Sequence, residues 1–149
     1  MRVIVQRISE GHINIEGVPG PEIGHGLMVL LGIGADDGVE DVEWLVKKLT
    51  ELRIFTDSDG KMNLSIRDVK GAFGVVSQFT LHAKTKKGTR PSFIHAAKPE
   101  IAEPLYQQFI NQLRSTGFRV ETGSFGANMD VVIVNQGPVT IWLDTKNKE

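Results

Sequence analysis

Runs of strand-type sequence dominate this chain, and only two segments have the spacing of an amphipathic helix. Apolar residues recur every three or four positions from Val39 to Leu52 and from about Pro99 to Arg114. Strands are expected at residues 2–8, 12–17, 27–34, 73–81, 118–123, 129–136 and 139–144. This order favours an α+β fold, a curved, mainly antiparallel sheet or partial barrel with two main helices packed against it.

Local signals refine several of these elements. The first two runs, RVIVQRI and HINIEG, are separated by a short polar break and are expected to pair with each other. Asp36 or Asp37 is available as the N-cap of the first helix. Pro104 falls in the second turn of the second helix, where it should bend or delay that helix.

Length, charge and composition limit the class of protein. A chain of 149 residues suits a single domain, 1–149, that is large enough to bury a core. A net charge of −1 argues against a uniformly basic surface, although a local basic patch is compatible with it. The lack of cysteine excludes disulfides, thiolate metal ligands and cysteine nucleophiles. No apolar run approaches the ~18 residues of a membrane span, so we expect a cytoplasmic protein with no membrane partner.

One stretch, LMVLLGIGADDGVEDVEWL, imitates a dinucleotide-binding turn. Asp36 and Asp37 would place carboxylates where a pyrophosphate approaches the helix, and this repulsion favours a simple strand-to-helix loop. The chain has no G-x-S-x-G or H-E-x-x-H motif, and its four histidines are far apart in sequence. We therefore expect no cofactor and no metal site.

The segment Val75–Phe93, VVSQFTLHAKTKKGTRPSF, begins as a strand-type run and ends in polar sequence. If the strand continues regularly, Gln78, Thr80 and His82 share one face, opposite a largely apolar face. Simple solvent exposure is the commoner explanation for such polar strand residues. A functional site is the alternative.

A group of cations follows this run. Between His82 and Pro99 there are five cations and no carboxylate: Lys84, Lys86, Lys87, Arg90 and Lys98. This local segregation of charge could meet a phosphate backbone. A solvated loop explains it without any partner.

The C-terminal run DVVIVNQGPVTIWLD alternates like a strand but contains Gly137-Pro138. Proline lacks the N–H that a strand ladder needs, so it is expected at an edge, a bulge or a turn. The dipeptide itself is not diagnostic, because Gly20-Pro21 occurs in an ordinary turn-rich connection.

Two motifs of this chain, SQFTL at 77–81 and NQGPVT at 135–140, resemble the paired signature of the D-aminoacyl-tRNA deacylases, also called D-tyrosyl-tRNA(Tyr) deacylases. The similarity extends over essentially the whole chain, through MRVIVQRISEG, LRIFTDSDGKMNLSI, TKKGTRPSF and FGANMDVVIVNQGPVTIWLD. It implies a homodimeric enzyme that hydrolyses the ester between a D-amino acid and the 3′ end of tRNA. Such an enzyme spares L-aminoacyl-tRNA and proofreads chirality in translation.

The resemblance gives the Gly-Pro dipeptide a role. It implies that the Gly137-Pro138 peptide is cis and projects into the active site of the partner subunit. The two carbonyls would engage the α-ammonium of the substrate and occupy the space that an L side chain needs. Many D-amino acids should then be accepted, and glycyl-tRNA should be hydrolysed too because glycine has no side chain to exclude. Arg7 would support this loop, or it is an ordinary strand-surface charge.

For the hydrolytic step, the resemblance implies the residues Ser77, Gln78, Phe79 and Thr80. Thr80 is offered as the nucleophile, but a threonine hydroxyl needs a positioned base, and His82 is the only candidate beside the motif. Alternatively, Gln78, Thr80 and backbone N–H groups near Ser77–Phe79 orient the ester and stabilise its oxyanion. Water then attacks with help from the ribose 2′-OH.

Other parts of the chain would bind the tRNA. Phe125 and Met129 match the part of the family that receives the terminal adenine, and core packing is the alternative. The loop side chains would contact tRNA phosphates, namely Lys84, Lys86, Lys87 and Arg90. Two rival functions remain open: a non-catalytic RNA-binding dimer that uses this loop, and a hydrolase of another small ester.

Overall fold

The computed structural model describes residues 1–149. Its helices are α1 (Val39–Glu51), α2 (Pro99–Ser115) and the short 3-10 helix η1 (Phe79–His82). Its strands are β1 (Arg2–Ile15), β2 (Val18–Pro19), β3 (Gly26–Gly32), β4 (Phe55–Thr56), β5 (Met62–Leu64), β6 (Ala72–Ser77), β7 (Val120–Thr122) and β8 (Met129–Asp144). Six strands form one sheet in the order β2-β1-β3-β6-β7, with β8 also paired to β1, and β4 pairs with β5 separately.

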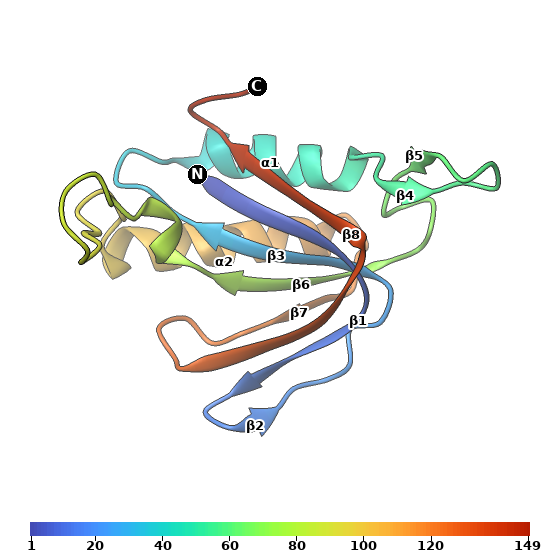
Figure 1. Cartoon of the computed structure of the whole chain (residues 1–149), viewed down its shortest axis with the longest axis horizontal. Coiled ribbons are helices and arrows are strands. Elements are labelled where there is room, and N and C mark those ends of the chain that lie inside the picture. Colours follow the sequence, from blue (N-terminus) through green and yellow to red (C-terminus); the bar gives the residue numbers. More distant parts are fainter.

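The sheet is mixed. β1 pairs antiparallel with β2, β3 and β8, whereas β6 is parallel to both β3 and β7. The connections before and after β6 contain α1 and α2, and long crossover connections of this kind allow parallel pairing. Figure 1 shows the sheet curling so that β1 and β8 bend together. The protein therefore has a mixed α+β fold with two main helices and a curled, half-barrel sheet.

β1 is one continuous strand of 14 residues, so the expectation of two N-terminal strands paired with each other is wrong. Both halves pair instead with β8, with one register shift at Arg7 and a second at Ser9, within the polar break. Gly11 lets the strands approach closely, because a Cβ there would lie 2.8 Å from the Val132 carbonyl oxygen. The break therefore bends the strand without ending it.

The main core lies between the two helices and the sheet. It includes Val42, Leu45 and Leu49 of α1, Phe109, Ile110 and Leu113 of α2, and Val3, Val29 and Val75 of the sheet. Along α2, Ile101 is 46% exposed whereas Tyr106 is buried. The Tyr106 hydroxyl donates to the Val75 carbonyl at 3.1 Å, and burial raises the pKa of Tyr106 to about 12. Pro104 lies inside α2 and does not delay its start.

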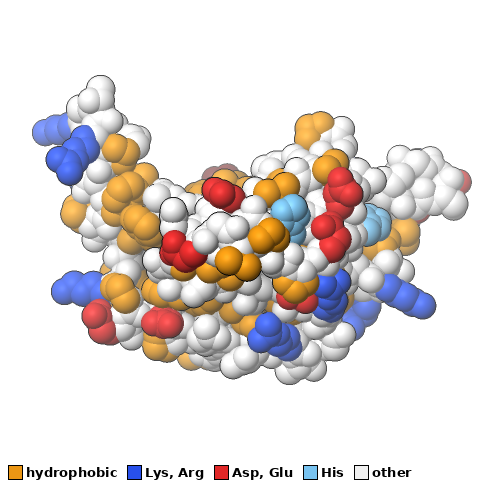
Figure 2. Space-filling view, turned by 90° about the horizontal axis from the view of Figure 1, so that it is seen from below, with side chains coloured by type: hydrophobic (Ala, Val, Ile, Leu, Met, Phe, Trp, Pro, Cys, Tyr) orange, Lys and Arg blue, Asp and Glu red, His pale blue; other side chains and the backbone are white.

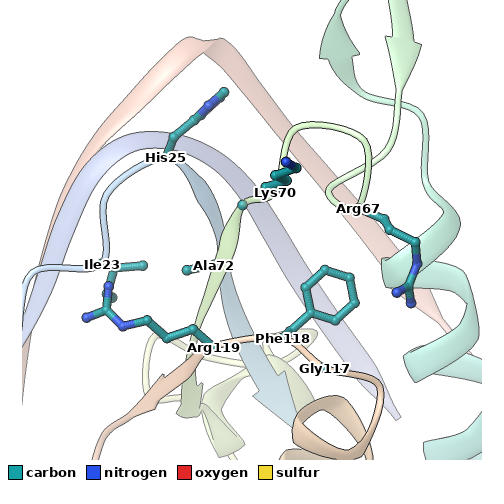
Figure 3. Close-up of a pocket in the computed structure, with 9 residues that line it drawn as sticks. Ile23, His25, Arg67, Lys70, Ala72, Gly117, Phe118 and Arg119 are labelled. Carbon is teal, nitrogen blue, oxygen red and sulfur yellow. The ribbon is translucent and has the colours of Figure 1, made fainter.

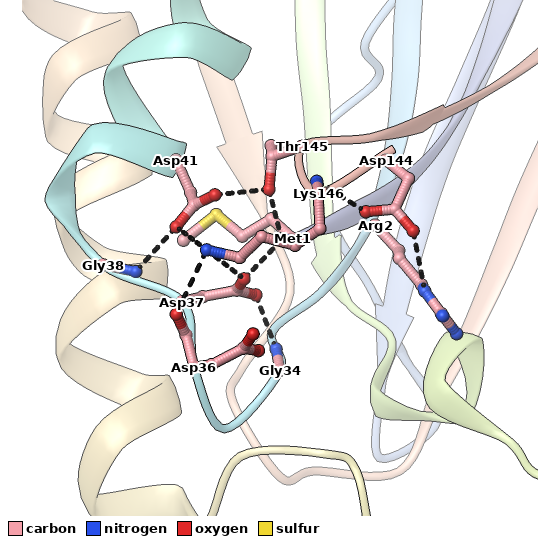
Figure 4. A network of polar contacts seen from close by, with 10 residues as sticks. All are labelled: Met1, Arg2, Gly34, Asp36, Asp37, Gly38, Asp41, Asp144, Thr145 and Lys146. Atoms are coloured by element: carbon pink, nitrogen blue, oxygen red, sulfur yellow. Dashed lines mark hydrogen bonds and ion pairs between the residues drawn. The ribbon is translucent and has the colours of Figure 1, made fainter. Parts of the chain in front are cut away.

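A polar network fixes the start of α1 (Figure 4). The expectation that Asp36 or Asp37 caps this helix is wrong, since Gly38 is the N-cap. The Asp37 carboxylate instead accepts from the Gly34 amide and from the N-terminal ammonium of Met1, both at 2.6 Å. The Asp41 carboxylate accepts from the Gly38 amide at 2.8 Å. The network therefore ties the first residue of the chain to the loop between β3 and α1.

Asp41 also joins this network to the C-terminus. Its carboxylate accepts from the Thr145 hydroxyl, and the Lys146 ammonium lies 3.0 Å away. Burial by itself raises the pKa of Asp41, but the hydrogen bonds from Thr145, Gly38 and Lys146 outweigh it and lower the pKa to about 2. Asp41 is therefore a carboxylate that the folded state holds ionised.

The surface carries charges of both signs. Acidic, basic and apolar side chains intermingle over the face seen in Figure 2, which fits the net charge of −1. Neither main helix is long and apolar enough to cross a membrane.

Candidate active site

The motif SQFTL leaves the sheet after its first residue. β6 ends at Ser77, and Phe79–His82 form η1, so the expected alternation of faces beyond Ser77 is wrong. The strand ends here because its partner β3 ends at Gly32, and the Gln78 amide makes its bond to the Leu31 carbonyl at 2.7 Å. Beyond that point the chain turns on itself.

The turn is held from outside by the first strand. The Arg2 guanidinium donates to the Leu81 carbonyl at 3.0 Å, and Arg2 also pairs with Asp144. Within the turn, the Ala83 amide donates to the Thr80 carbonyl at 3.0 Å. The Gln78–His82 backbone therefore has a fixed shape relative to β1 and β8.

A cavity of about 640 Å³, called the Ser77 cavity below, opens beside this turn. Ser77, Gln78 and Phe79 line it, and Phe125 and Met129 line it from another segment of the chain. The structure thus brings together five of the residues expected at the site. Thr80, Arg7, Gly137 and Pro138 do not line this cavity.

Sequence reasoning missed other parts of the wall. The cavity is also lined by Phe93, Ala96, Ala97, Lys98, Pro99 and Asn128. Phe93 meets Phe79 edge to face, with ring centroids 5.0 Å apart. TKKGTRPSF, which ends in Phe93, belongs to the segments that carry the family resemblance, but its spacing gives no sign of this contact.

Thr80 has a polar partner but no bonded base. The Gln78 side-chain amide donates to the Thr80 hydroxyl, and both groups lie toward solvent. No histidine, lysine or carboxylate side chain is hydrogen-bonded to Thr80. This arrangement orients the hydroxyl without supplying a group to remove its proton.

His82 is buried at the end of η1 rather than sharing a face with Thr80. Only 7% of its surface is exposed, and its Nε2 atom has no hydrogen-bond partner. Burial lowers the pKa of His82 below its ordinary value, although a backbone hydrogen bond to Gly32 opposes the shift. His82 packs close to Gly32 and Gly34, where added Cβ atoms would meet its ring at 3.2 and 3.0 Å.

Phe125 and Met129 lie between the apolar core and the cavity. Phe125 packs against Tyr106, with ring centroids 5.7 Å apart, and Met129 packs against the smaller apolar cluster that contains Ile8 and Val76. Each is only partly buried, and each also faces the cavity. Core packing therefore holds two apolar side chains at the cavity wall.

Gly137 and Pro138 lie in an exposed bulge of β8. Asn135 pairs with Ile8 and Thr140 pairs with Gln6, so the residues between them loop out opposite Arg7. The Gly137-Pro138 peptide bond is cis. The expected pair of strands at 129–136 and 139–144 is therefore one strand with a bulge at the dipeptide.

The bulge is supported from beneath. Arg7 is only 7% exposed, and its guanidinium donates to the Ile54 carbonyl at 2.6 Å and to the Gln136 carbonyl at 3.3 Å. The Asn135 side-chain amide donates to the carbonyls of Arg7 and Val139, both at 3.0 Å. Arg7 is thus a buried contact of the bulge and not an exposed strand charge.

The basic loop forms a separate hollow of about 440 Å³. Lys84, Lys86, Lys87 and Arg90 line it, and none of them takes part in an ion pair. Two backbone hydrogen bonds between Lys84 and Ser92, at 2.7 and 3.1 Å, close the loop. The fifth cation, Lys98, lies apart from them at the wall of the Ser77 cavity. No group of three or more His, Asp or Glu side chains is placed to hold a metal ion.

Comparison with known proteins places the chain in a family. Residues 4–144 match the family model described as D-Tyr-tRNA(Tyr) deacylase. A protein named D-aminoacyl-tRNA deacylase from Bacteroides thetaiotaomicron is 55% identical over 150 residues, which cover 100% of both chains.

Two solved structures have the same fold. One, named c-Myc DNA Unwinding Element Binding Protein, is 40% identical with a TM-score of 0.91 over 97% of this chain and 99% of that one. The other, described as a probable eukaryotic D-amino acid tRNA deacylase, is 22% identical with a TM-score of 0.81 over 95% and 97%. By its sequence over nearly its whole length, this chain belongs to the D-Tyr-tRNA(Tyr) deacylase family.

Proposed function

We propose that this protein hydrolyses the ester bond of D-aminoacyl-tRNA, releasing the D-amino acid and tRNA. The observation that carries the proposal is the cavity in which the SQFTL motif faces Phe125 and Met129. Its lining includes residues to which the family resemblance assigns the site, namely Ser77–Phe79, Phe125 and Met129. Full-length relatives also bear the name D-aminoacyl-tRNA deacylase. The cavity takes the terminal adenosine between its aromatic and apolar walls, with the ester beside Ser77–Thr80.

The reaction needs donors for the developing oxyanion. The backbone N–H of Gln78 already donates to the Leu31 carbonyl, so it is not such a donor. Phe79 is the first residue of η1, and the first N–H groups of a helical turn have no partner within that turn. The Phe79 N–H therefore stabilises the oxyanion, an interaction worth about 3 kcal/mol when preorganised.

Thr80 positions the substrate in this scheme. Its hydroxyl already accepts a hydrogen bond from the side-chain amide of Gln78, and no base is bonded to it. Water attacks the ester carbonyl carbon with help from the ribose 2′-OH. The C–O bond to the ribose 3′ oxygen breaks, its electron pair stays on that oxygen, and the oxygen takes up the proton that the water releases. No covalent enzyme intermediate is formed.

Chirality is selected by Gly137 and Pro138 of a partner subunit in a homodimer. Both residues are exposed and do not line the cavity of their own chain, so they are available to a second copy. β8 supports such a dimer because it is an edge strand with exposed apolar side chains at Val132, Val134 and Trp142. The two carbonyls bind the substrate ammonium and exclude an L side chain. Glycyl-tRNA, which has nothing to exclude, is also a substrate.

The loop cations Lys84, Lys86, Lys87 and Arg90 contact tRNA phosphates. Their side chains are exposed and form no ion pair, and they follow the Ser77–Thr80 segment closely in the sequence. Their contribution falls as salt rises, because phosphate contacts release counterions. The protein acts in the cytoplasm, where charged tRNA is used in translation.

A second candidate function is nucleic-acid binding without hydrolysis. It is favoured by the unpaired basic loop and by the related solved structure whose name describes a DNA-binding protein. Deacylation assays with paired D- and L-aminoacyl-tRNA distinguish the candidates. Release of the D-amino acid alone supports the deacylase, whereas tight tRNA or DNA binding with no release of either amino acid supports the binding protein. Equal hydrolysis of both, or of small esters only, would contradict the chiral assignment.

A further inference from the structure

A second hollow, of about 550 Å³, lies at the opposite end of β6 from the Ser77 cavity. We call it the Ala72-end hollow, and it is lined by segments before β3, before β6 and after α2 (Figure 3). Strands rise about 3.3 Å per residue, so its Ala72 wall lies about 17 Å from Ser77. The two cavities are therefore separate sites.

Basic side chains surround the Ala72-end hollow. Its lining includes His25, Arg67, Lys70 and Arg119, and no acidic residue. Arg67 and Lys70 take part in no ion pair, while Arg119 pairs through Nε with Glu121 at 3.1 Å. The hollow thus carries a net positive charge in a chain whose overall charge is −1.

The cations are held in place by the surrounding structure. The Arg67 guanidinium lies over the Phe118 ring, 4.8 Å from its centroid, and Phe118 meets Phe73 edge to face. Arg119 donates through Nη2 to the Glu22 carbonyl at 2.6 Å. An arginine fixed in this way loses little freedom when it binds an anion.

Lys70 is placed there by an uncommon backbone conformation. Its φ is +52°, a region that glycine and asparagine adopt more readily than lysine. The next residue, Gly71, has no room for a Cβ, which would lie 2.9 Å from Ile66 and 3.1 Å from the His25 carbonyl oxygen. The turn therefore carries an exposed, unpaired cation at a position where local geometry does not favour lysine.

We propose that the Ala72-end hollow binds the phosphate backbone of the tRNA body, away from the aminoacyl end. Figure 3 shows that the basic side chains come from different segments and do not converge on one point. Such a rim suits an extended polyanion that meets several cations at once better than a single small anion. The proposal rests on the proposed function for the identity of the nucleic acid.

The test is the binding of uncharged tRNA to the full chain, measured over a range of salt concentrations. Lys70→Asn removes the charge and keeps a residue that tolerates the left-handed backbone. Arg67→Gln removes the second unpaired cation, and Lys47→Gln on the exposed face of α1 is the matched control for charge. Each of the first two variants should lower the slope of log affinity against log salt by about 1 and weaken binding about three- to tenfold near 100 mM salt. The control should match the unmodified protein.

Two results separate this proposal from the proposed function. If the protein deacylates D-aminoacyl-tRNA but Lys70→Asn and Arg67→Gln bind tRNA like Lys47→Gln, the hollow is not a tRNA contact. If these variants lower the salt slope but the unmodified protein deacylates nothing, the hollow binds nucleic acid and the proposed function fails. Saturable binding of inorganic phosphate or AMP, with tRNA affinity unchanged in the variants, would assign the hollow to a small anion and overturn the proposal.

Discussion

The guanidinium of Arg7 occupies the space into which a Cβ on Gly137 would project. An ideal Cβ there would lie 2.8 Å from the Arg7 Nη2 atom, and Gly137 has a φ of +115°, which L side chains rarely adopt. Arg7 is buried and bonded to the carbonyls of Ile54 and Gln136, so it cannot move away freely. The bulge at Gly137 therefore requires glycine for both steric and conformational reasons.

Gly137→Ala should displace the bulge and lower D-aminoacyl-tRNA hydrolysis at least about tenfold, with strain on the order of 1–3 kcal/mol. Gly17→Ala is the control, because Gly17 also has a positive φ of +79° but no atom within 4 Å of an added Cβ. It should lose some stability and keep its activity. A Gly137→Ala enzyme with an unchanged rate and an unchanged ratio of D- to L-aminoacyl-tRNA hydrolysis would contradict the proposed chiral role of the bulge.

Asn135→Asp should disturb the same bulge without changing its volume. The amide that donates to the Arg7 and Val139 carbonyls becomes a carboxylate oxygen, so two carbonyls lose their donor, and repulsion replaces attraction. We expect a loss of about 1–3 kcal/mol in stability and a lower D/L ratio of kcat/KM. Asn111→Asp, on the exposed side of α2, makes the same change of charge and should have neither effect. Equal behaviour of the two variants would contradict the positioning role of Asn135.

Phe79→Pro tests the proposed oxyanion donor. Proline removes the Phe79 N–H, and the first position of a helical turn tolerates proline because that N–H has no partner in the turn. Phe79→Ala keeps the N–H and loses only the ring that packs on Phe93. The proline variant should have a kcat about 100-fold below that of the alanine variant. Equal single-turnover rates in the two folded variants would exclude this donor.

Thr80→Ala should retain substantial activity, because Thr80 is assigned to positioning and has no bonded base. Single-turnover deacylation measures the chemical step, and mass spectrometry of the quenched enzyme detects any acyl adduct. An adduct on Thr80, or a folded Thr80→Ala variant that binds substrate but does not hydrolyse it, would establish Thr80 as the nucleophile instead.

Acid should destabilise the protein through Asp41. Its pKa is lowered from 3.8 to about 2 in the folded protein, so its contribution is fully present above pH 3.8 and is lost as the pH falls towards 2. The shift corresponds to about 2 kcal/mol. Urea unfolding at pH 6 and at pH 2.5 should show a smaller loss of stability for Asp41→Asn than for the unmodified protein. The same loss in both would show that Asp41 does not carry this part of the acid sensitivity.

Local sequence predicted the elements whose signals are local. The helical spacing located α1 and α2, and the apolar run at residues 27–34 located β3. The end of β6 was not predictable in this way, because it depends on where its neighbour β3 stops. Gly38 is the N-cap of α1 instead of Asp36 or Asp37. The Asp37 carboxylate is bonded to Gly34 and to Met1, and Met1 is remote in sequence, so this outcome has no local signal.

The candidate site also combines short local motifs, which sequence can locate, with contacts between distant segments, which it cannot. The resemblance located Ser77–Thr80 and the Gly-Pro dipeptide, both of which are short motifs. It also offered Arg7 as a support of the Gly-Pro loop, with a surface charge as the alternative. It could not show that Phe93 lies beside Phe79, since this is a contact between distant segments. The burial of His82 also went unforeseen, because the expected strand placed it beside Thr80.

We propose that one site is built from the Ser77–Thr80 segment of one subunit and from Gly137 and Pro138 of its partner. Mixing Gly137→Ala and Phe79→Pro proteins, after unfolding and refolding them together, tests it directly by D-aminoacyl-tRNA deacylation. In an equal mixture half of the dimers are heterodimers, and each regains one of its two sites, so activity should recover to about one quarter of that of the unmodified protein. Activity that stays at the average of the two variants refolded separately, in a mixture shown to contain heterodimers, would contradict the claim.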